Sequence, residues 1–351
     1  YMVENLKVHA ELSLISDDGL GSEYRISLKS DSLKDTIPEA VADKIKNMPE
    51  TENVYATKYT MGELQISKNE FLSEEEWSDY FKYQNQEPYY IQRYDGICKQ
   101  QEDGNYRIKY NVYGYDEAMI EQLRDFILEG EIQPETIKNN NQVIVTANMD
   151  GQGNYFFYGK KPGDTITLRV PKTENYTDEL LKFQSGEENY IEKEFEIAAI
   201  VNRPLAQEKD FLNTEVWKNA QSVIMTGEQM EENFGITDYS FINASPADSA
   251  DAKIVSNQLL QVIRDVPKAV LQDYTTAIAT QKGYLGQQQI FFSSIAVILL
   301  IISLFHIVNS MSHTILTRRR EYGIIRAIGI TDGGFYKMIL QTGILYGLLA
   351  D

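Results

Sequence analysis

The stretch that decides the architecture of this chain runs from Ile290 to Val308 and reads IFFSSIAVILLIISLFHIV. These 19 residues include three serines and His306 but no charged side chain. An α-helix rises about 1.5 Å per residue, so the stretch spans roughly 28 Å, close to the hydrocarbon thickness of a bilayer, about 30 Å. Buried helices of water-soluble domains rarely run this long without a charge. We therefore predict a transmembrane helix, which we assign to residues 286–313.

Basic residues indicate the orientation of this helix. Three arginines follow it, whereas the preceding KGYLGQQQ carries a single lysine. Because loops rich in Lys and Arg stay on the cytoplasmic side, we expect residues 314–333 to be cytoplasmic and residues 1 to about 285 to be extracytoplasmic, in a protein of the cell membrane. The apolar stretch Phe335–Ala350 predicts that a returning transmembrane helix starts within residues 334–351. The sequence begins with Tyr1 and ends inside this stretch, so we expect further helices in the full protein, in a number that we leave open.

The part before the helix is strongly acidic. Of the 351 residues, 42% are apolar and 24% charged, which is typical of a folded chain with room for two or three domains. Before Ile290, 28 Lys and Arg stand against 49 Asp and Glu, a net charge of −21. Phosphate backbones require cationic partners, so we exclude nucleic acid. A cationic peptide, a lipoprotein or a wall-associated partner is compatible with this charge, as is acidity that only keeps the domain soluble.

No pattern indicates catalysis or a bound cofactor. Cys98 is the only cysteine, so no internal disulfide can form. His9, His306 and His313 are too dispersed for a metal site, and neither CxxC nor HExxH occurs. The sequence also has no GxxxxGK[ST] phosphate loop and no recognisable group of nucleophile, base and orienting residue. We predict no catalytic, metal or cofactor residue and no enzyme activity in this chain.

Two segments near the ends of the acidic part have the pattern of βαβ units. In the first, Tyr24–Lys29 alternates as a strand, Asp35 and Pro38 open a helix, and Val54–Tyr59 resumes strand character. Two βαβ halves separated by a long insertion predict an α+β fold in which the halves pack together.

The second unit lies just before the membrane stretch. Tyr239–Asn243 is expected to be a strand, Ser245, Pro246 and Asp248 to cap a helix, and Lys268–Gln272 to form a second strand.

The insertion between the halves has mostly β patterns after two helices. A capping box predicts a short helix over residues 73–84, and a second helix begins at Asp116 and ends at Gly130. Strands are expected at Gln142–Thr146, Tyr155–Tyr158, Thr165–Val170 and Phe195–Val201. In KKPGDTITLRV, Pro162 and Gly163 favour a tight turn over a binding loop. The 23 tyrosines suit half-buried strand positions better than a dedicated aromatic site.

The segment TRRREYGIIRAIGIT, Thr317–Thr331, resembles the signature of the FtsX-like permease family of ABC transporters. In that family the helix after the outer domain leads into basic residues, then Glu, apolar residues, Arg, Ala, an apolar residue and Gly. The matching residues here are Arg320, Glu321, Ile324, Ile325, Arg326, Ala327, Ile328 and Gly329. Tyr113–Asp116 followed by ILEGEI, VIVTANM, PGDTITL and FEIAAIV is similar to the block order of a MacB-type periplasmic core domain.

The resemblance implies a division of the chain. Residues 1–110 and 236–285 correspond to a porter-like α+β subdomain, and 111–235 to an inserted, β-rich, sabre-like subdomain. Transmembrane α-helices follow. The segment that couples to the ATPase comprises Arg318, Arg319, Arg320, Glu321, Tyr322, Arg326 and Gly329. If the segment is helical, Glu321, Ile325 and Ile328 share one side and Tyr322, Arg326 and Gly329 another.

The family also implies a function. The chain would be the permease subunit that passes ATP hydrolysis in a separate cytoplasmic ATPase subunit to the outer domain, with ATP bound by that partner and a second permease copy or homologue beside it. Export or extraction of peptides, lipoproteins or lipids would follow. The alternative is a membrane-anchored interaction or sensor domain that regulates a partner such as a wall hydrolase. A kinase-type sensor is disfavoured because SHTIL, which contains His313, only faintly resembles a phosphoacceptor box.

Overall fold

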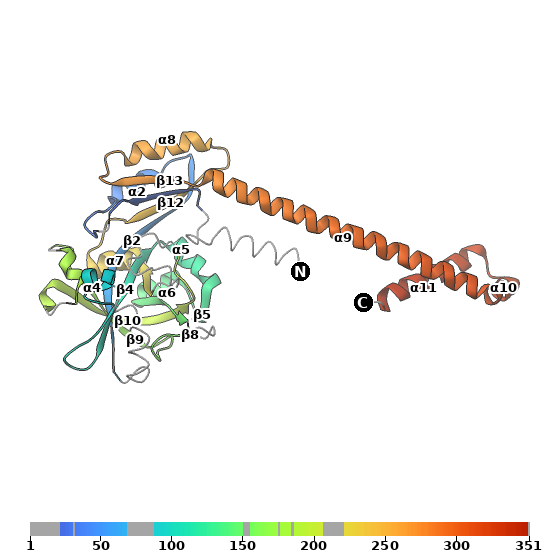
Figure 1. Ribbon diagram of the computed structural model, residues 1–351, viewed down its shortest axis with the longest axis horizontal. Helices are drawn as coiled ribbons and strands as arrows, with labels where there is room; N and C mark the ends of the chain where they lie inside the picture. The colour runs from blue at the N-terminus through green and yellow to red at the C-terminus, as the bar shows by residue number, and fades with distance from the viewer. Residues whose placement is uncertain are drawn as a thin grey trace. The chain divides into compact units, whose positions relative to one another are not determined.

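The computed structural model describes residues 22–30, 32–68, 88–149, 155–174, 176–183, 186–205 and 221–349. The helix predicted over residues 73–84 and His9 lie outside this set. The described residues divide into a larger unit that ends at Ala279 and a helical unit that begins at Thr280. Both are drawn in Figure 1.

The two ends of the larger unit share one antiparallel sheet. Its strands are β1 (Tyr24–Leu28), β12 (Phe241–Pro246), β13 (Ala269–Asp273) and the first half of β2 (Thr51–Ile66), in the order β13-β1-β12-β2. The connections from β1 to β2 and from β12 to β13 each contain a helix, and each joins two strands that have a third strand between them in the sheet. The mixed α and β class predicted from the sequence is confirmed.

Two helices cover one face of this sheet, α2 (Glu39–Lys46) and α8 (Ala252–Ile263). Both bury an apolar stripe at helical spacing, for which Ala42 and Ile45 of α2 and Leu259 of α8 are fully buried examples.

The start of α8 differs from the prediction. Ser245 and Pro246 end strand β12, and the N-cap is Asp251, whose carboxylate accepts a hydrogen bond of 2.9 Å from the backbone N–H of Lys253. Ser245 pairs with Glu52 across the sheet, and this strand pairing takes precedence over its local preference for a helix cap.

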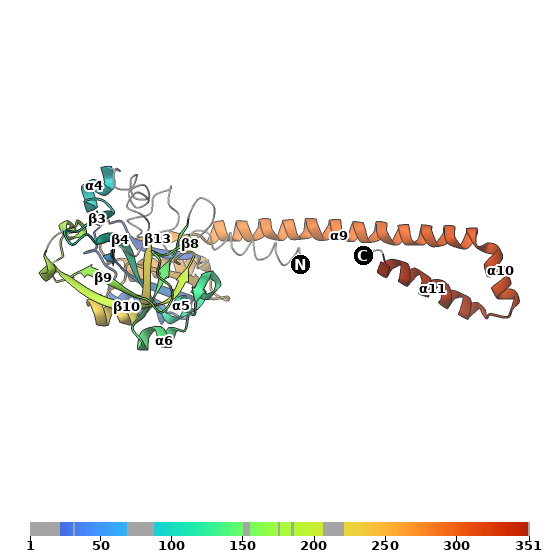
Figure 2. The ribbon, with the colours of Figure 1, turned by 90° about the horizontal axis from the view of Figure 1, so that it is seen from below.

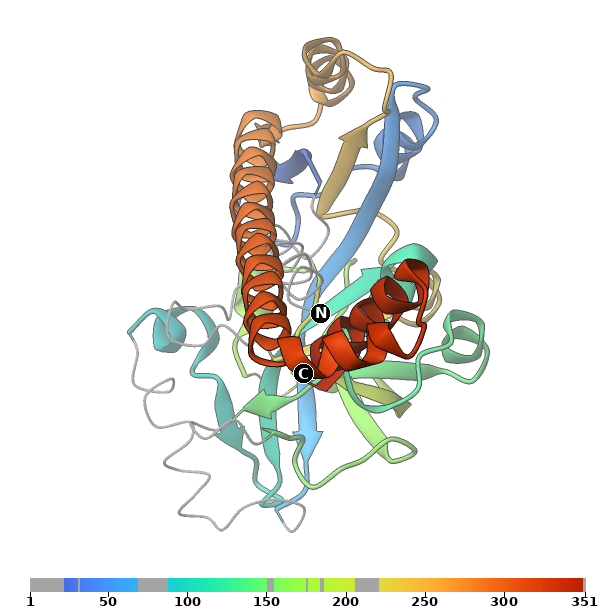
Figure 3. The same ribbon diagram turned by 90° about the vertical axis from the view of Figure 1, so that its right-hand side faces the viewer.

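Strand β2 continues from the first sheet into a second one, and Figure 3 shows it as one long strand. From Lys58 onward it pairs with β4 (Tyr106–Tyr115), and residues 63–65 also pair with β9 (Thr165–Pro171). The strands β10 (Tyr190–Val201), β6 (Gln142–Thr146) and β11 (Ser222–Thr226) complete the circuit from β9 back to β4. These six strands form a closed ring, which leaves no free edge along its hydrogen-bonded path.

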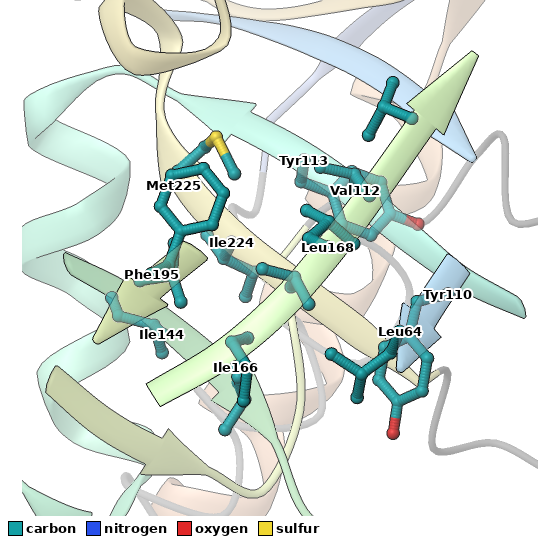
Figure 4. Close-up of a cluster of buried hydrophobic side chains, with 14 of the residues drawn as sticks. Leu64, Tyr110, Val112, Tyr113, Ile144, Ile166, Leu168, Phe195, Ile224 and Met225 are labelled. Carbon is teal, nitrogen blue, oxygen red and sulfur yellow. The ribbon is translucent and has the colours of Figure 1, made fainter. Parts of the chain in front are cut away.

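The strands of this ring contribute most of the larger of two hydrophobic cores, with buried side chains on both of their faces. Figure 4 shows part of it, formed by Leu64, Tyr110, Val112, Tyr113, Ile144, Ile166, Leu168, Phe195, Ile224 and Met225. The core changes along β2, because Ala56 packs with the first sheet and Tyr59 with the ring. A single strand therefore contributes to both cores. The division between residues 110 and 111 that the sequence suggested stays a prediction.

Smaller elements surround the ring. They are α4 (Pro88–Tyr94), β3 (Cys98–Gln100), α5 (Glu117–Gln122), η1 (Leu123–Phe126), β5 (Ile127–Gly130), α6 (Pro134–Asn139), the hairpin of β7 (Asn148–Met149) and β8 (Tyr155–Phe156), η2 (Asp178–Leu181), η3 (Glu187–Asn189) and α7 (Gly227–Phe234). The predicted turn is present: the N–H of Asp164 donates to the carbonyl of Lys161 at 3.0 Å, and Gly163 has φ +93°.

The helix predicted from Asp116 to Gly130 is much shorter in the structure. Asp116 does cap α5, since it accepts a 3.1 Å hydrogen bond from the N–H of Met119. After η1 the chain becomes strand β5, in which Ile127 pairs with Val201. The apolar residues that suggested one helix face are therefore divided between a short helix and a strand, which shows tertiary pairing overriding local periodicity.

Candidate functional site

The helical unit contains the segment that the sequence singled out. Helix α9 (Thr275–Thr317) is followed by α10 (Arg319–Ala327) and α11 (Asp332–Leu349). Figure 2 shows the chain reversing at α10, so that α11 runs back in the opposite direction to α9.

Within α9, residues Gly286–Thr317 are long and apolar enough to cross a membrane, and no other helix in the described part of the chain is. The most apolar window of this segment has no buried residue. Ile290 and Phe305, for example, are 70% and 71% exposed. Such a surface is unfavourable in water and favourable in lipid, because apolar area costs free energy only where water contacts it. The span ends four residues later than the predicted 286–313, and α11 as a second span stays a prediction.

Two serine hydroxyls of the span are bonded within the helix. The hydroxyls of Ser294 and Ser303 donate to the carbonyls of Ile290 and Leu299, at 2.7 and 2.8 Å. A hydroxyl bonded to the carbonyl four residues earlier needs no water, so these serines are compatible with a lipid environment. His313 lies in the same helix, with its Nδ1 3.3 Å from the hydroxyl of Thr317.

One side of α10 contacts the start of α11. The rings of Tyr322 and Phe335 meet edge to face, with centroids 5.5 Å apart. The guanidinium carbon of Arg326 lies 5.1 Å from the centroid of Phe335, and Arg326 also pairs with Asp332. These contacts hold α10 against α11 through one edge-to-face pair and one charged group that binds both a ring and a carboxylate.

Gly329 makes the turn between the two helices. Its φ is +100°, a left-handed conformation that a side chain would strain. Two of the residues predicted to share a side, Tyr322 and Arg326, thus face α11, and Gly329 directs the chain into it.

The remaining surface of α10 is open. Ile324 is 61% and Ile328 81% exposed, whereas Ile325 is less exposed and half-buried. Ile324 is thus the more exposed of the two neighbouring isoleucines, and the grouping of Glu321, Ile325 and Ile328 stays a prediction.

Charged residues surround this open apolar surface. Arg318, Arg319 and Arg320 are exposed, and Arg318 lies 4.0 Å from the carboxylate of Glu321, a pair too solvated to stabilise the helix much. The two exposed isoleucines lie on the same side of the helix as Arg320 and Glu321 and form with them a surface that can contact a partner. We call this surface the outward face of α10: Arg320, Glu321, Ile324 and Ile328.

The larger unit also contains a buried cluster of charged side chains that was not predicted from the sequence. Glu63, Lys109 and Arg169 are directly opposite one another on β2, β4 and β9. Lys109 Nζ lies 2.6 Å and Arg169 Nε 3.6 Å from the Glu63 carboxylate, and all three side chains are at most 4% exposed. Phe183 and Tyr190 cover the two cations, with the Lys109 ammonium 4.1 Å and the Arg169 guanidinium 3.6 Å from the ring centroids.

Burial dominates the acid–base behaviour of this cluster. Desolvation lowers the pKa of Lys109 below its usual range although Glu63 acts in the opposite direction.

Outside this cluster, burial raises the pKa of the Cys98 thiol, which disfavours the reactive thiolate. In the described residues no group of three His, Cys, Asp or Glu could hold a metal ion.

The helical unit thus contains one candidate membrane span followed by a short amphipathic helix, and a large α+β domain precedes it in the chain. Comparison with family descriptions is more specific. Residues 293–350 match the family described as FtsX-like permease C-terminal. The resemblance predicted from the sequence is thus confirmed for this segment.

Two solved structures resemble the chain at low identity. One is the periplasmic region of MacB from Actinobacillus actinomycetemcomitans, with 10% identity, a TM-score of 0.41 and coverage of 78% of this chain and 97% of that one. The other is the extracellular domain of the noncanonic ABC-type transporter YknZ from Gram-positive bacteria, with 8% identity, a TM-score of 0.38 and coverage of 72% and 100%. Comparison with curated proteins finds no match.

Proposed function

We propose that this chain is the permease subunit of an ABC transporter, and that the outward face of α10 docks on a separate cytoplasmic ATPase subunit. The observation that carries the proposal is the exposure of Ile324 and Ile328 on a helix that follows a membrane span and lies within an FtsX-like segment. Burying one isoleucine contributes about 1.5–3 kcal/mol, so two can anchor a helix in a groove.

The contacts of α10 suggest how movement passes through the permease. A displacement of α10 by the ATPase would move α11 with it, because Tyr322 and Arg326 bind Phe335 and Asp332. Movement of α9 would then reach the larger unit. Because arginines follow the span, we propose that the larger unit lies on the outer side of the membrane. In this proposal the chain transmits force and the ATPase subunit binds and hydrolyses ATP.

The proposal includes the other components that such a machine needs. A second permease copy or homologue would complete the pathway, α11 would be a second span, and the substrates would be extracytoplasmic peptides, lipoproteins or lipids. The acidic charge of the residues before Ile290, a net of −21, favours cationic over anionic cargo.

Site-specific photo-crosslinking tests the docking proposal. A photoreactive residue at position 328 of the full permease, co-expressed with its ATPase subunit, should crosslink to that subunit. The control position is 301, where Ile301 is 44% exposed in the middle of the span and should meet lipid. A complex that hydrolyses ATP but gives no crosslink from position 328 would contradict the proposal. Ile328→Asp should also reduce association with the ATPase by about tenfold or more.

A further inference from the structure

The larger unit contains a cleft of about 630 Å3, a volume typical of small-molecule sites. Its wall is built from several parts of the chain: the loop after β1 that contains Leu33 and Thr36, residues Tyr59 and Thr60 of β2, the residues that follow β9, and the segment after α7. The cleft lies beside an isolated strand bridge between Ile37 and Tyr239.

Hydroxyl groups dominate the lining. Of the fifteen lining residues, eight carry one: Thr36, Tyr59, Thr60, Thr173, Tyr176, Thr177, Thr237 and Ser240. A hydroxyl both donates and accepts hydrogen bonds, so a wall of this kind matches a ligand whose own groups do both. We call this site the hydroxyl cleft.

The charges of the hydroxyl cleft fit neither an anion nor a strong cation. Among the described residues that line the cleft, Lys34 is the one cation and is exposed, whereas phosphate sites use several cations or backbone donors. Its carboxylates are Glu174, which is exposed, and Asp238, which already accepts a 2.8 Å hydrogen bond from the hydroxyl of Thr36. Neither is a buried carboxylate of the kind that holds an ammonium or guanidinium group.

Apolar surface completes the lining. Leu33, Pro171 and Ile236 contribute aliphatic groups. The hydroxyl of Tyr59 donates to Asn111 at 2.7 Å and that of Tyr176 to Asp178 at 3.3 Å, so these two of the eight hydroxyls already have partners. A sugar has the matching character, with C–H faces that pack on apolar side chains and hydroxyls that bond to hydroxyls.

We propose that the hydroxyl cleft binds a neutral carbohydrate segment. The proposal is independent of ATPase docking, because it concerns binding to the larger unit and needs neither nucleotide nor the partner subunit. Since the lining comes from the loop of the first sheet as well as from β2 and β9, a bound sugar would bridge the two cores of this unit.

The test is isothermal titration calorimetry of the full chain in lipid nanodiscs with two neutral trisaccharides, maltotriose and tri-N-acetylchitotriose. A lysine tripeptide and inorganic phosphate serve as the cationic and anionic probes. The expected result is saturable binding of at least one trisaccharide and no comparable binding of the charged probes.

Two matched variants locate the binding. Thr237→Trp should abolish it, because Thr237 is an exposed residue of the wall and a large side chain there fills the cleft. Thr165→Trp, at an exposed position of β9 that does not line the cleft, should leave it unchanged. Asp238→Asn keeps an acceptor for Thr36 and should change sugar affinity by less than about threefold, whereas Ser240→Ala removes one hydroxyl and should weaken it about three- to tenfold.

Other results would overturn the proposal. Failure of both trisaccharides to bind, tighter binding of the lysine tripeptide or of phosphate, or sugar binding that survives Thr237→Trp would each exclude a carbohydrate site in this cleft. Crosslinking of α10 to the ATPase is measured separately, so failure of one proposal leaves the other testable.

Discussion

Removal of the Glu63 carboxylate should destabilise the larger unit strongly. In Glu63→Gln the buried cations Lys109 and Arg169 lose their shared counter-charge, while the shape of the side chain is kept. Breaking a buried ion pair by removing one partner costs about 3–5 kcal/mol, because a charge remains buried without compensation. A domain of ordinary stability has about 5–15 kcal/mol in total, so this one substitution should remove about a fifth or more of it.

Removal of Lys109 should cost less. The cluster contains two cations and one anion, so Lys109→Met leaves a balanced pair of Glu63 and Arg169. The lowered pKa of Lys109 indicates that burial opposes its charged form more than Glu63 favours it. We therefore expect Glu63→Gln to be clearly more destabilising than Lys109→Met.

The pH dependence has a definite sign. Because the pKa of Lys109 is lower in the folded than in the unfolded chain, the unfolded state binds more protons between these two values. The free energy of unfolding of the unmodified chain, compared with that of Lys109→Met, should therefore rise as the pH approaches about 10.4, the usual pKa of lysine.

Urea denaturation of the full chain, followed by circular dichroism, measures these differences. The control is Asp95→Asn, which removes an exposed pair with Lys99 whose side chains are 47% and 48% exposed and should cost less than about 1 kcal/mol. Equal destabilisation by Lys109→Met and Glu63→Gln, or a cost of Glu63→Gln no larger than that of the exposed control, would contradict this prediction.

Three further predictions use the same assay. Burial and nearby carboxylates raise the pKa of Tyr24 to about 12 in the folded chain. The stability that this shift contributes is present below pH 10 and is lost as the pH rises from about 10 to 12, where Tyr24 ionises first in the unfolded chain. Tyr24→Phe should therefore remove this part of the alkaline destabilisation. Gly130→Ala should cost at least twice as much as Gly163→Ala: both glycines have positive φ, but a Cβ at Gly130 would lie 2.3 Å from the carbonyl oxygen of Ala198, whereas the Cβ at Gly163 meets open space. Thr226→Ala should cost about 1 kcal/mol, because it breaks the capping box that begins α7.

Local sequence signals predicted the strands of the larger unit well where the strands are also locally apolar. The expected segments at residues 142–146 and 165–170 correspond closely to β6 and β9. The start of α5 at Asp116 was also predictable, since an N-cap acts within its own turn.

Pairings between distant strands could not be predicted in this way. Nothing local relates Glu63 to Lys109 and Arg169, which meet only because β2 lies between β4 and β9. The strand pattern alone predicts that each of these charged residues is exposed. In the structure, Phe183 packs on Lys109 and Tyr190 packs on Arg169.

The coupling segment shows the same division between local and long-range information. Helical spacing predicted that α10 has two sides, and the positions of Tyr322 and Arg326 on one of them agree with their contacts to Phe335. Spacing alone could not decide which side meets the permease, because both carry an apolar and a charged residue. The contact with α11 assigns Tyr322 and Arg326 to that role. Ile324 and Ile328 are therefore the residues left for a partner, and position 328 is a better probe of docking than Arg326.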